Sequence, residues 1–263
     1  MSEYSQFLEC LNIDEFKINF IKNDNALTNY AKTNNKIWED WLEKYIKESY
    51  QPNTNMIDIG ANIGTTSLIM SRYISENYYI HSFEPVYHNI LEMNVKQNNL
   101  EDKIKTFNFG LSNKSEILKG GFIDFSIEAN YGFTQISNLE KIDEIDNNYK
   151  IYVNTLDSFN IQHVSFIKLD VEGHEREVLE GSINTIINNT PTILIEIWCT
   201  SKNSIEKYTK EQNLPEIKKQ FSVFEFLFNL GYICIPVSPN SDDFLFIHYT
   251  KKEILNKIIN NLD

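Results

Sequence analysis

The chain has 263 residues, enough for one large α/β domain or two small ones with a substantial core. Its formal net charge of −13 repels phosphate backbones, so nonspecific binding of nucleic acid is not expected. The three cysteines form no C-x-x-C pair, and neither a zinc cluster nor a disulfide framework is indicated.

The N-terminal residues contain acids and lack a basic segment followed by an apolar one, so no secretory signal is predicted. No apolar run approaches the roughly 18 residues of a membrane helix. We therefore expect a cytoplasmic protein without a membrane span. The sequence carries no signal for its oligomeric state.

Residues 1–50 are interpreted as an N-terminal helical extension that precedes a domain at 51–263. Asn34 or Asn35 is a candidate cap for a helix in this extension. The helix is expected to pack on the domain or to cover the site. Its predicted apolar face consists of Ile37, Trp38, Trp41, Leu42, Tyr45 and Ile46.

From residue 56 onward, strand-like and helix-like patterns alternate, which predicts an α/β fold with a mostly parallel sheet and helices on both faces. Residues 112–156 break the alternation and are interpreted as a β-rich insertion, with turns at Gly120-Gly121 and Asp146-Asn147-Asn148. The predicted strands are 56–60, 79–83, 104–109, 164–171, 193–198, 232–237 and 244–249. The predicted helices are 63–75, 87–99, one carrying Val178 to Ile187, one from Pro215, and one after Thr250.

The most informative segment follows the first of these strands. Asp58, Gly60 and Gly64 form the pattern D-x-G-x-x-x-G at a strand–turn–helix junction. Glycine takes positive φ cheaply and lets backbone approach a ligand, and the next helix offers free N–H groups. Because residue 62 is Asn, the dinucleotide fingerprint G-x-G-x-x-G is absent, which disfavours a nicotinamide dehydrogenase. A plain turn with packing glycines is the alternative.

Two further segments place acids at strand ends, where ligands bind in this architecture. Glu84 ends the second strand, and Pro85 forces it into an extended conformation. In Ile167–Glu175, alternation puts Lys168, Asp170 and Glu172 on one strand face. Charged groups on a buried central strand are costly unless they are paired or functional.

Glu196 is isolated in another apolar strand, which is expected to be adjacent. The alternative is a structural Lys–Glu pair with acids capping the next helix. Asp170, Glu172 and Glu196 are a conceivable set of hard oxygen ligands, but nothing in their spacing demands a metal, and none is predicted.

Together these segments resemble the FkbM family of methyltransferases. The resemblance covers about residues 50–200, and its most specific part is the Lys-x-Asp-x-Glu-Gly pattern at Lys168. It rests on Asp58-Ile59-Gly60-Ala61-Asn62-Ile63-Gly64, Phe83-Glu84-Pro85, Leu156-Asp157-Ser158, Ile167–Glu175 and Glu196.

The resemblance implies a Rossmann-like class I methyltransferase fold, S-adenosylmethionine (SAM) as the methyl donor, and a hydroxyl acceptor on a sugar or a glycosylated small molecule. It implies donor contacts at Asp58, Gly60, Asn62, Gly64, Glu84, Asn108, Ser112 and Asp170. Glu84 would hold the ribose hydroxyls, and Asn108 and Ser112 would contact adenine, although turn chemistry also explains the latter two.

A hydroxyl nucleophile benefits from a positioned base. Asp170 is the first candidate, and His174 is the second because its reference pKa lies near 6.5. His174 is equally explained as a surface residue of a helix. Glu172 is expected to position the acceptor or the donor, Lys168 to act on Asp170, and Asp157 to have a structural role. A binding protein that kept the fold without turnover is the competing hypothesis.

Overall fold

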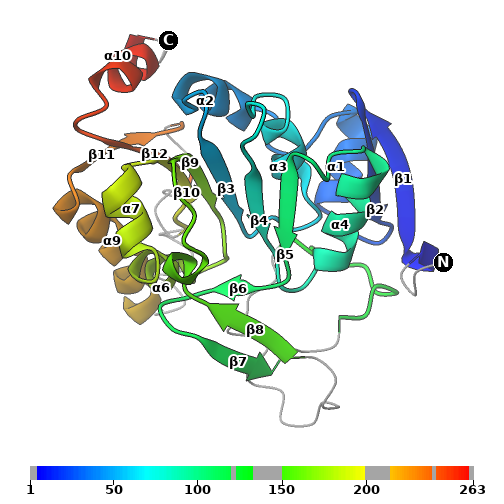
Figure 1. The fold of residues 1–263 in the computed structure, drawn as a ribbon. Coiled ribbons are helices and arrows are strands. Elements are labelled where there is room, and N and C mark those ends of the chain that lie inside the picture. Colours follow the sequence, from blue (N-terminus) through cyan, green and yellow to red (C-terminus); the bar gives the residue numbers. More distant parts are fainter. Residues whose placement is uncertain (1–4, 120–122, 133–149, 199–213, 239–240, 261–263) are drawn as a thin grey trace.

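A seven-stranded sheet forms the centre of the computed structural model, which describes residues 5–119, 123–132, 150–198, 214–238 and 241–260 (Figure 1). The strand order is β11-β12-β10-β9-β3-β4-β5, parallel from β10 to β5, with β12 and β11 antiparallel. The strands are β3 Asn55–Ile59, β4 Ile80–Phe83, β5 Ile104–Phe107, β9 Val164–Leu169, β10 Thr192–Glu196, β11 Tyr232–Pro236 and β12 Asp243–His248. All seven predicted strands are present, and the mostly parallel sheet is confirmed.

Helices cover both faces of this sheet because alternate strand residues point to opposite sides. Met56 belongs to one buried cluster and its neighbour Ile57 to the other. The first cluster packs under α2 Leu42–Ser49, α3 Thr65–Met70, α4 His88–Gln97 and α10 Lys252–Asn260. The second packs under α6 Glu175–Glu180, α7 Ile183–Asn189 and α9 Leu214–Asn229. None of the described helices is long and apolar enough to cross a bilayer.

The single helix predicted after β9 is two helices, α6 and α7. The chain breaks at Gly181, where a Cβ would lie 2.0 Å from the backbone oxygen of Ser112. Asp157, in the short 3₁₀ helix Leu156–Phe159, then supplies the acceptors that the first turn of α7 needs. Its carboxylate accepts backbone N–H bonds from Asn184 and Thr185 at 2.9 and 2.8 Å. The structural role predicted for Asp157 is confirmed.

The insertion predicted to be β-rich contains a three-stranded sheet, which lies below the main sheet in Figure 1. Its strands are β6 Gly110–Leu111, β7 Glu116–Lys119 and β8 Lys150–Asn154, in the order β6-β8-β7. The two predicted turns, at 120–121 and 146–148, lie outside the described residues.

The N-terminal extension was interpreted as helical, but it is only partly so. A short 3₁₀ turn, Ser5–Phe7, leads into an antiparallel hairpin of β1 Leu8–Ile13 and β2 Phe16–Ile21, and α1 Leu27–Asn34 follows. The physical reason is visible in β2, where buried Phe16, Ile18 and Phe20 alternate with more exposed residues. The helix predicted from Ile37 begins later, at Leu42.

The buried amide of Asn94 on α4 joins this hairpin to the turn between β3 and α3, residues 60–64, which we call the glycine bend. Its Oδ1 accepts the backbone N–H of Asn19 at 2.7 Å, and its Nδ2 donates to the backbone oxygen of Ile63 at 2.8 Å. Both partners are backbone groups that lose water when the hairpin docks. The extension is therefore fixed to the segment that carries the D-x-G-x-x-x-G pattern.

Replacing Asn94 by Leu should lower the free energy of unfolding by about 2–4 kcal/mol, because two buried backbone groups lose their partners. Urea unfolding measures the change. Asn89→Leu on the same helix, at an exposed position, is the control and should change stability little. Equal stability of Asn94→Leu and the unaltered protein would contradict this role for the amide.

Candidate functional site

Acidic side chains meet at the carboxyl end of the parallel strands, on a single face of the sheet. Asp58 on β3 pairs in register with Lys168 on β9, and Glu196 on β10 pairs with Asp243 on β12. Since side chains alternate, Asp170 follows Lys168 on the same face. The strand face predicted for Lys168, Asp170 and Glu172 is confirmed for Lys168 and Asp170, whereas Glu172 lies beyond the end of β9 with φ +54° and outside the strand alternation. The adjacent strand predicted for Glu196 is confirmed.

The glycine bend packs directly on the end of β9. Gly60 has φ +80°, and a Cβ there would lie 1.7 Å from the backbone oxygen of Asp170. Gly64, with φ +95°, would place a Cβ 2.6 Å from Leu91 Cδ1. Both positions need glycine for conformation and for space. From the sequence, glycine is expected at position 60 to let backbone approach a ligand, whereas the atom nearest to a Cβ at this position is the backbone oxygen of Asp170.

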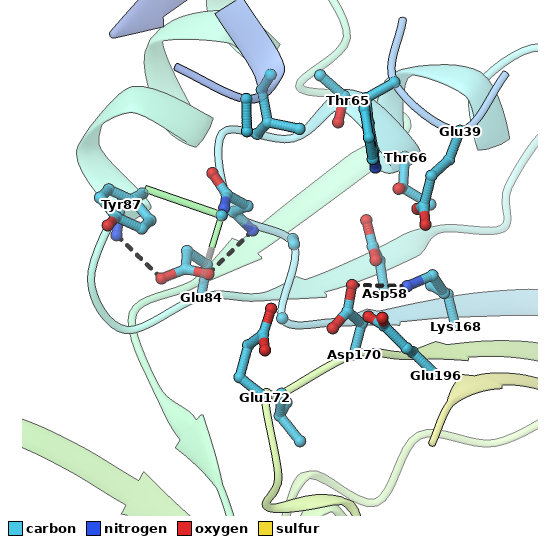
Figure 2. A pocket seen from close by; sticks show the side chains of 18 of the residues that line it. Glu39, Asp58, Thr65, Thr66, Glu84, Tyr87, Lys168, Asp170, Glu172 and Glu196 are labelled. Atoms are coloured by element: carbon cyan, nitrogen blue, oxygen red, sulfur yellow. Dashed lines mark hydrogen bonds and ion pairs between the residues drawn. The ribbon is translucent and has the colours of Figure 1, made fainter. Parts of the chain in front are cut away.

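Glu84 lies buried at the end of β4 and is already well bonded (Figure 2). Its Oε1 accepts backbone N–H bonds from Val86 at 2.6 Å and Tyr87 at 2.9 Å, and its Oε2 accepts that of Asn62 at 2.9 Å. Burial raises the pKa of Glu84, and these bonds oppose the rise. Glu84 thus holds the glycine bend against the start of α4, and at least one acceptor position on Oε2 is left for a ligand.

Lys168 is the buried cation of this face. Its side chain is 3% exposed, and its Nζ forms an ion pair with Asp170 Oδ2 at 3.0 Å. Burial disfavours the ammonium, but the carboxylates of Asp170 and Glu39 outweigh burial and hold the pKa of Lys168 above its ordinary value. Burial raises the pKa of Asp58 to about 6, although a hydrogen bond from Ser67 and the charge of Lys168 oppose it.

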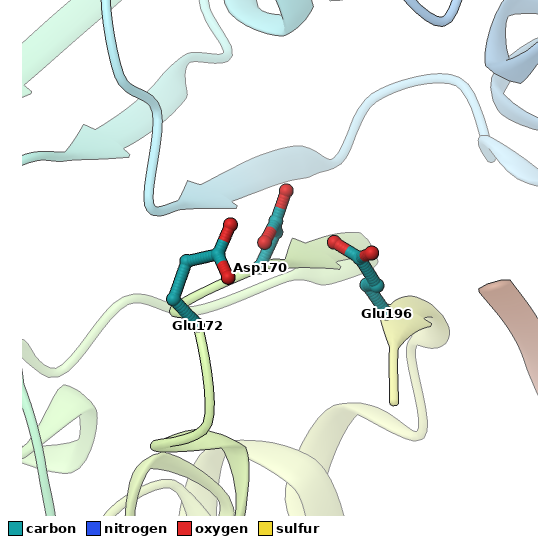
Figure 3. A group of neighbouring side chains, drawn as sticks. All are labelled: Asp170, Glu172 and Glu196. Carbon is teal, nitrogen blue, oxygen red and sulfur yellow. The ribbon is translucent and has the colours of Figure 1, made fainter. Parts of the chain in front are cut away.

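Three further carboxyl groups surround the ion pair and accept no hydrogen bond from a described residue: Glu39, Glu172 and Glu196. Carboxylate oxygens of Asp170, Glu172 and Glu196 lie within 4.8 Å of one another (Figure 3). Burial, followed by the charge of Asp170, raises the pKa of Glu172 to about 8 and that of Glu196 well above its ordinary value. The spacing would suit a hard cation, but clustered acids of this kind are common without one.

A cleft of about 500 Å³ opens above these groups, a volume within the range of small-molecule sites. Seven carboxyl side chains line it against one ammonium, that of Lys168, among the residues described. Its remaining walls are the glycine bend, the segment that leads into α4, the N-terminal segment, and Asn130 and Gly132 of the insertion. The lining acids are Glu39, Asp58, Glu84, Asp170, Glu172, Glu196 and Asp243.

The cleft contains some of the predicted site residues and not others. Gly60, Asn62 and the acids named above line it, whereas Gly64 lies behind the bend. His174 is not a lining residue, and its Nε2 shares a hydrogen bond of 2.9 Å with Ser112 Oγ. Asn108 and the buried Ser112 do not line it either. The residues brought together thus come from the glycine segment after β3, from Glu84-Pro85, from the end of β9 and from Glu196.

The N-terminal segment was expected to pack on the domain or to cover the site, but neither Glu39 in that segment nor Asp243 of β12 was singled out as a site residue, and both line the cleft. Trp38, Glu39 and Trp41 come from the turn before α2, and Asp243 begins β12. Trp38 is 45% exposed and packs edge-to-face on Tyr30, with ring centroids 5.0 Å apart. A signal existed for Asp243, an acid at the start of an apolar strand, but none linked Glu39 to residues more than a hundred positions away.

The strand order, the glycine bend and the acids at the strand ends define a Rossmann-like methyltransferase fold. Residues 58–234 match the model of the methyltransferase FkbM domain, and the chain belongs to this family. No curated protein matches.

Solved structures with a similar fold include three methyltransferases. The FkbM methyltransferase of Methylobacillus flagellatus is 16% identical over 78% of this chain and 50% of its own, with a TM-score of 0.44. This chain thus spans half the length of that protein. An O-methyltransferase of Bacillus cereus, in complex with S-adenosylhomocysteine (SAH), is 12% identical over 85% and 96% (TM-score 0.42). A SAM-dependent methyltransferase of Aquifex aeolicus is 12% identical over 84% and 95% (TM-score 0.44).

The family implies SAM, and the residues present fit it. Gly60 presents backbone without a side chain to the cleft, and Asn62 lines the cleft with it. Thr65 and Thr66 at the start of α3 line the cleft as well (Figure 2). The Glu84 carboxylate accepts the Asn62 N–H, and the backbone oxygen of Asp170 lies next to Gly60. A positively charged adenosyl compound would meet hydrogen-bond acceptors and negative charge along this cleft.

Raised carboxyl pKa values make the stability of the ligand-free protein fall with rising pH. The pKa of Glu39 is raised by burial from 4.5 to about 7, and that of Glu172 from 4.5 to about 8. The folded form therefore keeps protons that the unfolded chain has released, and this contribution is lost as pH rises through about 7 to 8. The free energy of unfolding should decrease between about pH 6 and pH 8.5, with a shallower slope in Glu172→Gln. An increase over this interval would contradict the assignment.

The packing of Gly60 gives a second prediction. Gly60→Ala should lose SAM binding and lower the melting temperature, because the new Cβ collides with the backbone of Asp170. Gly64→Ala should be milder, since its Cβ meets the end of a flexible leucine side chain. Calorimetric titration and thermal unfolding of both variants test this order, and a Gly60→Ala variant that binds SAM normally would refute it.

Proposed function

We propose that this protein is a SAM-dependent methyltransferase that methylates a hydroxyl group of a sugar or a glycosylated small molecule. The observation that carries the proposal is the Lys168–Asp170 ion pair, which lies beside Gly60. The cleft around it is large enough to hold the methyl group of a donor next to the hydroxyl group of an acceptor. When bound, SAM supplies a methyl group already activated by its sulfonium. The protein then has to align the acceptor oxygen and accept its proton.

Asp170 is the proposed general base. Its Oδ2 is held by Lys168, while its Oδ1 accepts no hydrogen bond from a described residue. The side chain is 27% exposed, so it is accessible from the cleft yet partly desolvated. These features support proton acceptance from a hydroxyl that lies in the cleft. His174, the second candidate, is not a lining residue of the cleft and shares a hydrogen bond with Ser112, so we do not propose it as the base.

Lys168 and Glu172 are proposed to act around this base. The buried ammonium of Lys168 fixes the direction of the Asp170 carboxylate, and a hydroxyl of the acceptor is a further partner for its N–H groups. Glu172 follows the strand with φ +54°, and its carboxyl group extends into the cleft (Figure 2). We propose that it holds a second hydroxyl of the acceptor or the amine of the donor.

Anionic acceptors are disfavoured by the lining of the cleft. Seven carboxyl groups against one lysine repel phosphates, which supports a small-molecule acceptor over nucleic acid.

The competing hypothesis is a SAM-binding protein without turnover. The paired, accessible Asp170 favours an enzyme. The cytoplasmic location expected from the sequence stays a prediction.

Methyl-labelled SAM tests the proposal directly. The purified protein is incubated with labelled SAM and an extract of small metabolites, saccharides included, and the label is followed by chromatography. The expected result is label in a saccharide fraction. The label should be stable as a methyl ether, and a glycosidase should release it together with the sugar that carries it. SAM binding without label in any fraction would favour the binding protein, and binding of NAD in place of SAM would refute both.

Asp170→Asn should lower turnover by about a hundredfold or more and leave SAM binding largely intact, since the amide keeps the shape but accepts no proton. Turnover and SAM affinity are measured in the same preparation. Glu101→Gln, a solvent-exposed change away from the cleft, is the control. If Asp170→Asn turned over normally, the base would have to be another group or solvent.

A further inference from the structure

The N-terminal segment contributes a charge to the cleft that the family domain does not contain. Glu39 precedes α2, and the family match begins only at residue 58. It has φ +61°, and its carboxyl group points toward the Lys168 side of the cleft (Figure 2). The charges that act on it come from Lys168, Asp170, Asp243 and Asp58.

The charges around Lys168 do not balance. Lys168 neutralises Asp170, but Glu39, Glu172 and Glu196 accept no hydrogen bond from a described residue. Asp243 Oδ1 is a buried oxygen for which the described part of the chain likewise offers no hydrogen-bond partner. Protons on these groups relieve the repulsion, and a positively charged ligand would relieve it better. The location of the ligand does not depend on these acids, because family membership and the glycine bend already indicate this cleft.

SAM and SAH differ in the charge on their sulfur, and a cleft lined by carboxyl groups responds to this difference. SAM carries a positive sulfonium, whereas SAH has a neutral thioether and is otherwise the same molecule without the methyl group. We infer that the carboxylates of Glu39 and Glu196 select the charged donor over its uncharged product, so that methyl transfer itself weakens binding and promotes product release. The inference rests on the proposed function, and it assigns the N-terminal segment a part in donor selectivity.

Calorimetric titration of the full chain tests this inference without any acceptor. SAM, SAH and sinefungin are titrated at about pH 8; sinefungin has a protonated amine where SAM has its sulfonium, and so separates charge from the methyl group. Glu39→Gln should weaken SAM and sinefungin by at least about fivefold, the effect of one unit charge at close range even in water. SAH should change by less than about twofold.

Two variants and one treatment keep the outcome interpretable. Glu196→Gln should act in the same direction as Glu39→Gln, and Glu101→Gln should leave all three affinities unchanged. Equal weakening of SAM and SAH, or none, would overturn the inference while leaving the proposed function in place. Loss of SAM binding after EDTA treatment would also overturn it, because the acids would then be holding a metal. Absence of any SAM or SAH binding to the unaltered protein would overturn the proposed function itself.

Discussion

The close approach of β3 and β9 at their carboxyl ends is the constraint on which the rest of the site depends. Gly60 has no side chain, so the bend can lie against the backbone oxygen of Asp170, while the Asp170 N–H donates to Ile59 at 3.0 Å. This contact fixes the place of the Asp170 carboxylate relative to the bend. A side chain at Gly60 would separate the two strands and displace the Asp170 carboxylate, the proposed base, from the glycine bend.

The charged side chains at the strand ends lie on one face of the sheet. Register pairs Asp58 with Lys168 and Glu196 with Asp243, so their side chains point to the same side. The opposite side of these strands is apolar and supports α6, α7 and α9. Burying several carboxylates beside a single ammonium costs stability, and burial accordingly raises the pKa values of Asp58 and Glu172 although the charge of Lys168 opposes the rise.

Sequence patterns predicted the parts of this arrangement that depend on local periodicity. Alternation along Ile167–Glu175 placed Lys168 beside Asp170, and the D-x-G-x-x-x-G spacing located the bend. What periodicity could not supply was contact between distant segments, such as Glu39 reaching the β9 acids. The bonds that engage Glu84 and His174 were hidden for the same reason, since their partners come from other elements. The hairpin at 8–21 did carry an alternating signal, in Phe16, Ile18 and Phe20, that a reading of the extension as helical overlooked.

We propose that an adenosyl methyl donor occupies the cleft between the glycine bend and the β9 and β10 acids. The decisive experiment is a crystal structure of the protein with SAH. The ligand should lie against Gly60 and Asn62, with its ribose near Glu84 and its sulfur toward Asp170. A ligand bound elsewhere, or a cleft closed by the side chains of Trp38 and Glu39 in crystals grown with SAH, would contradict it.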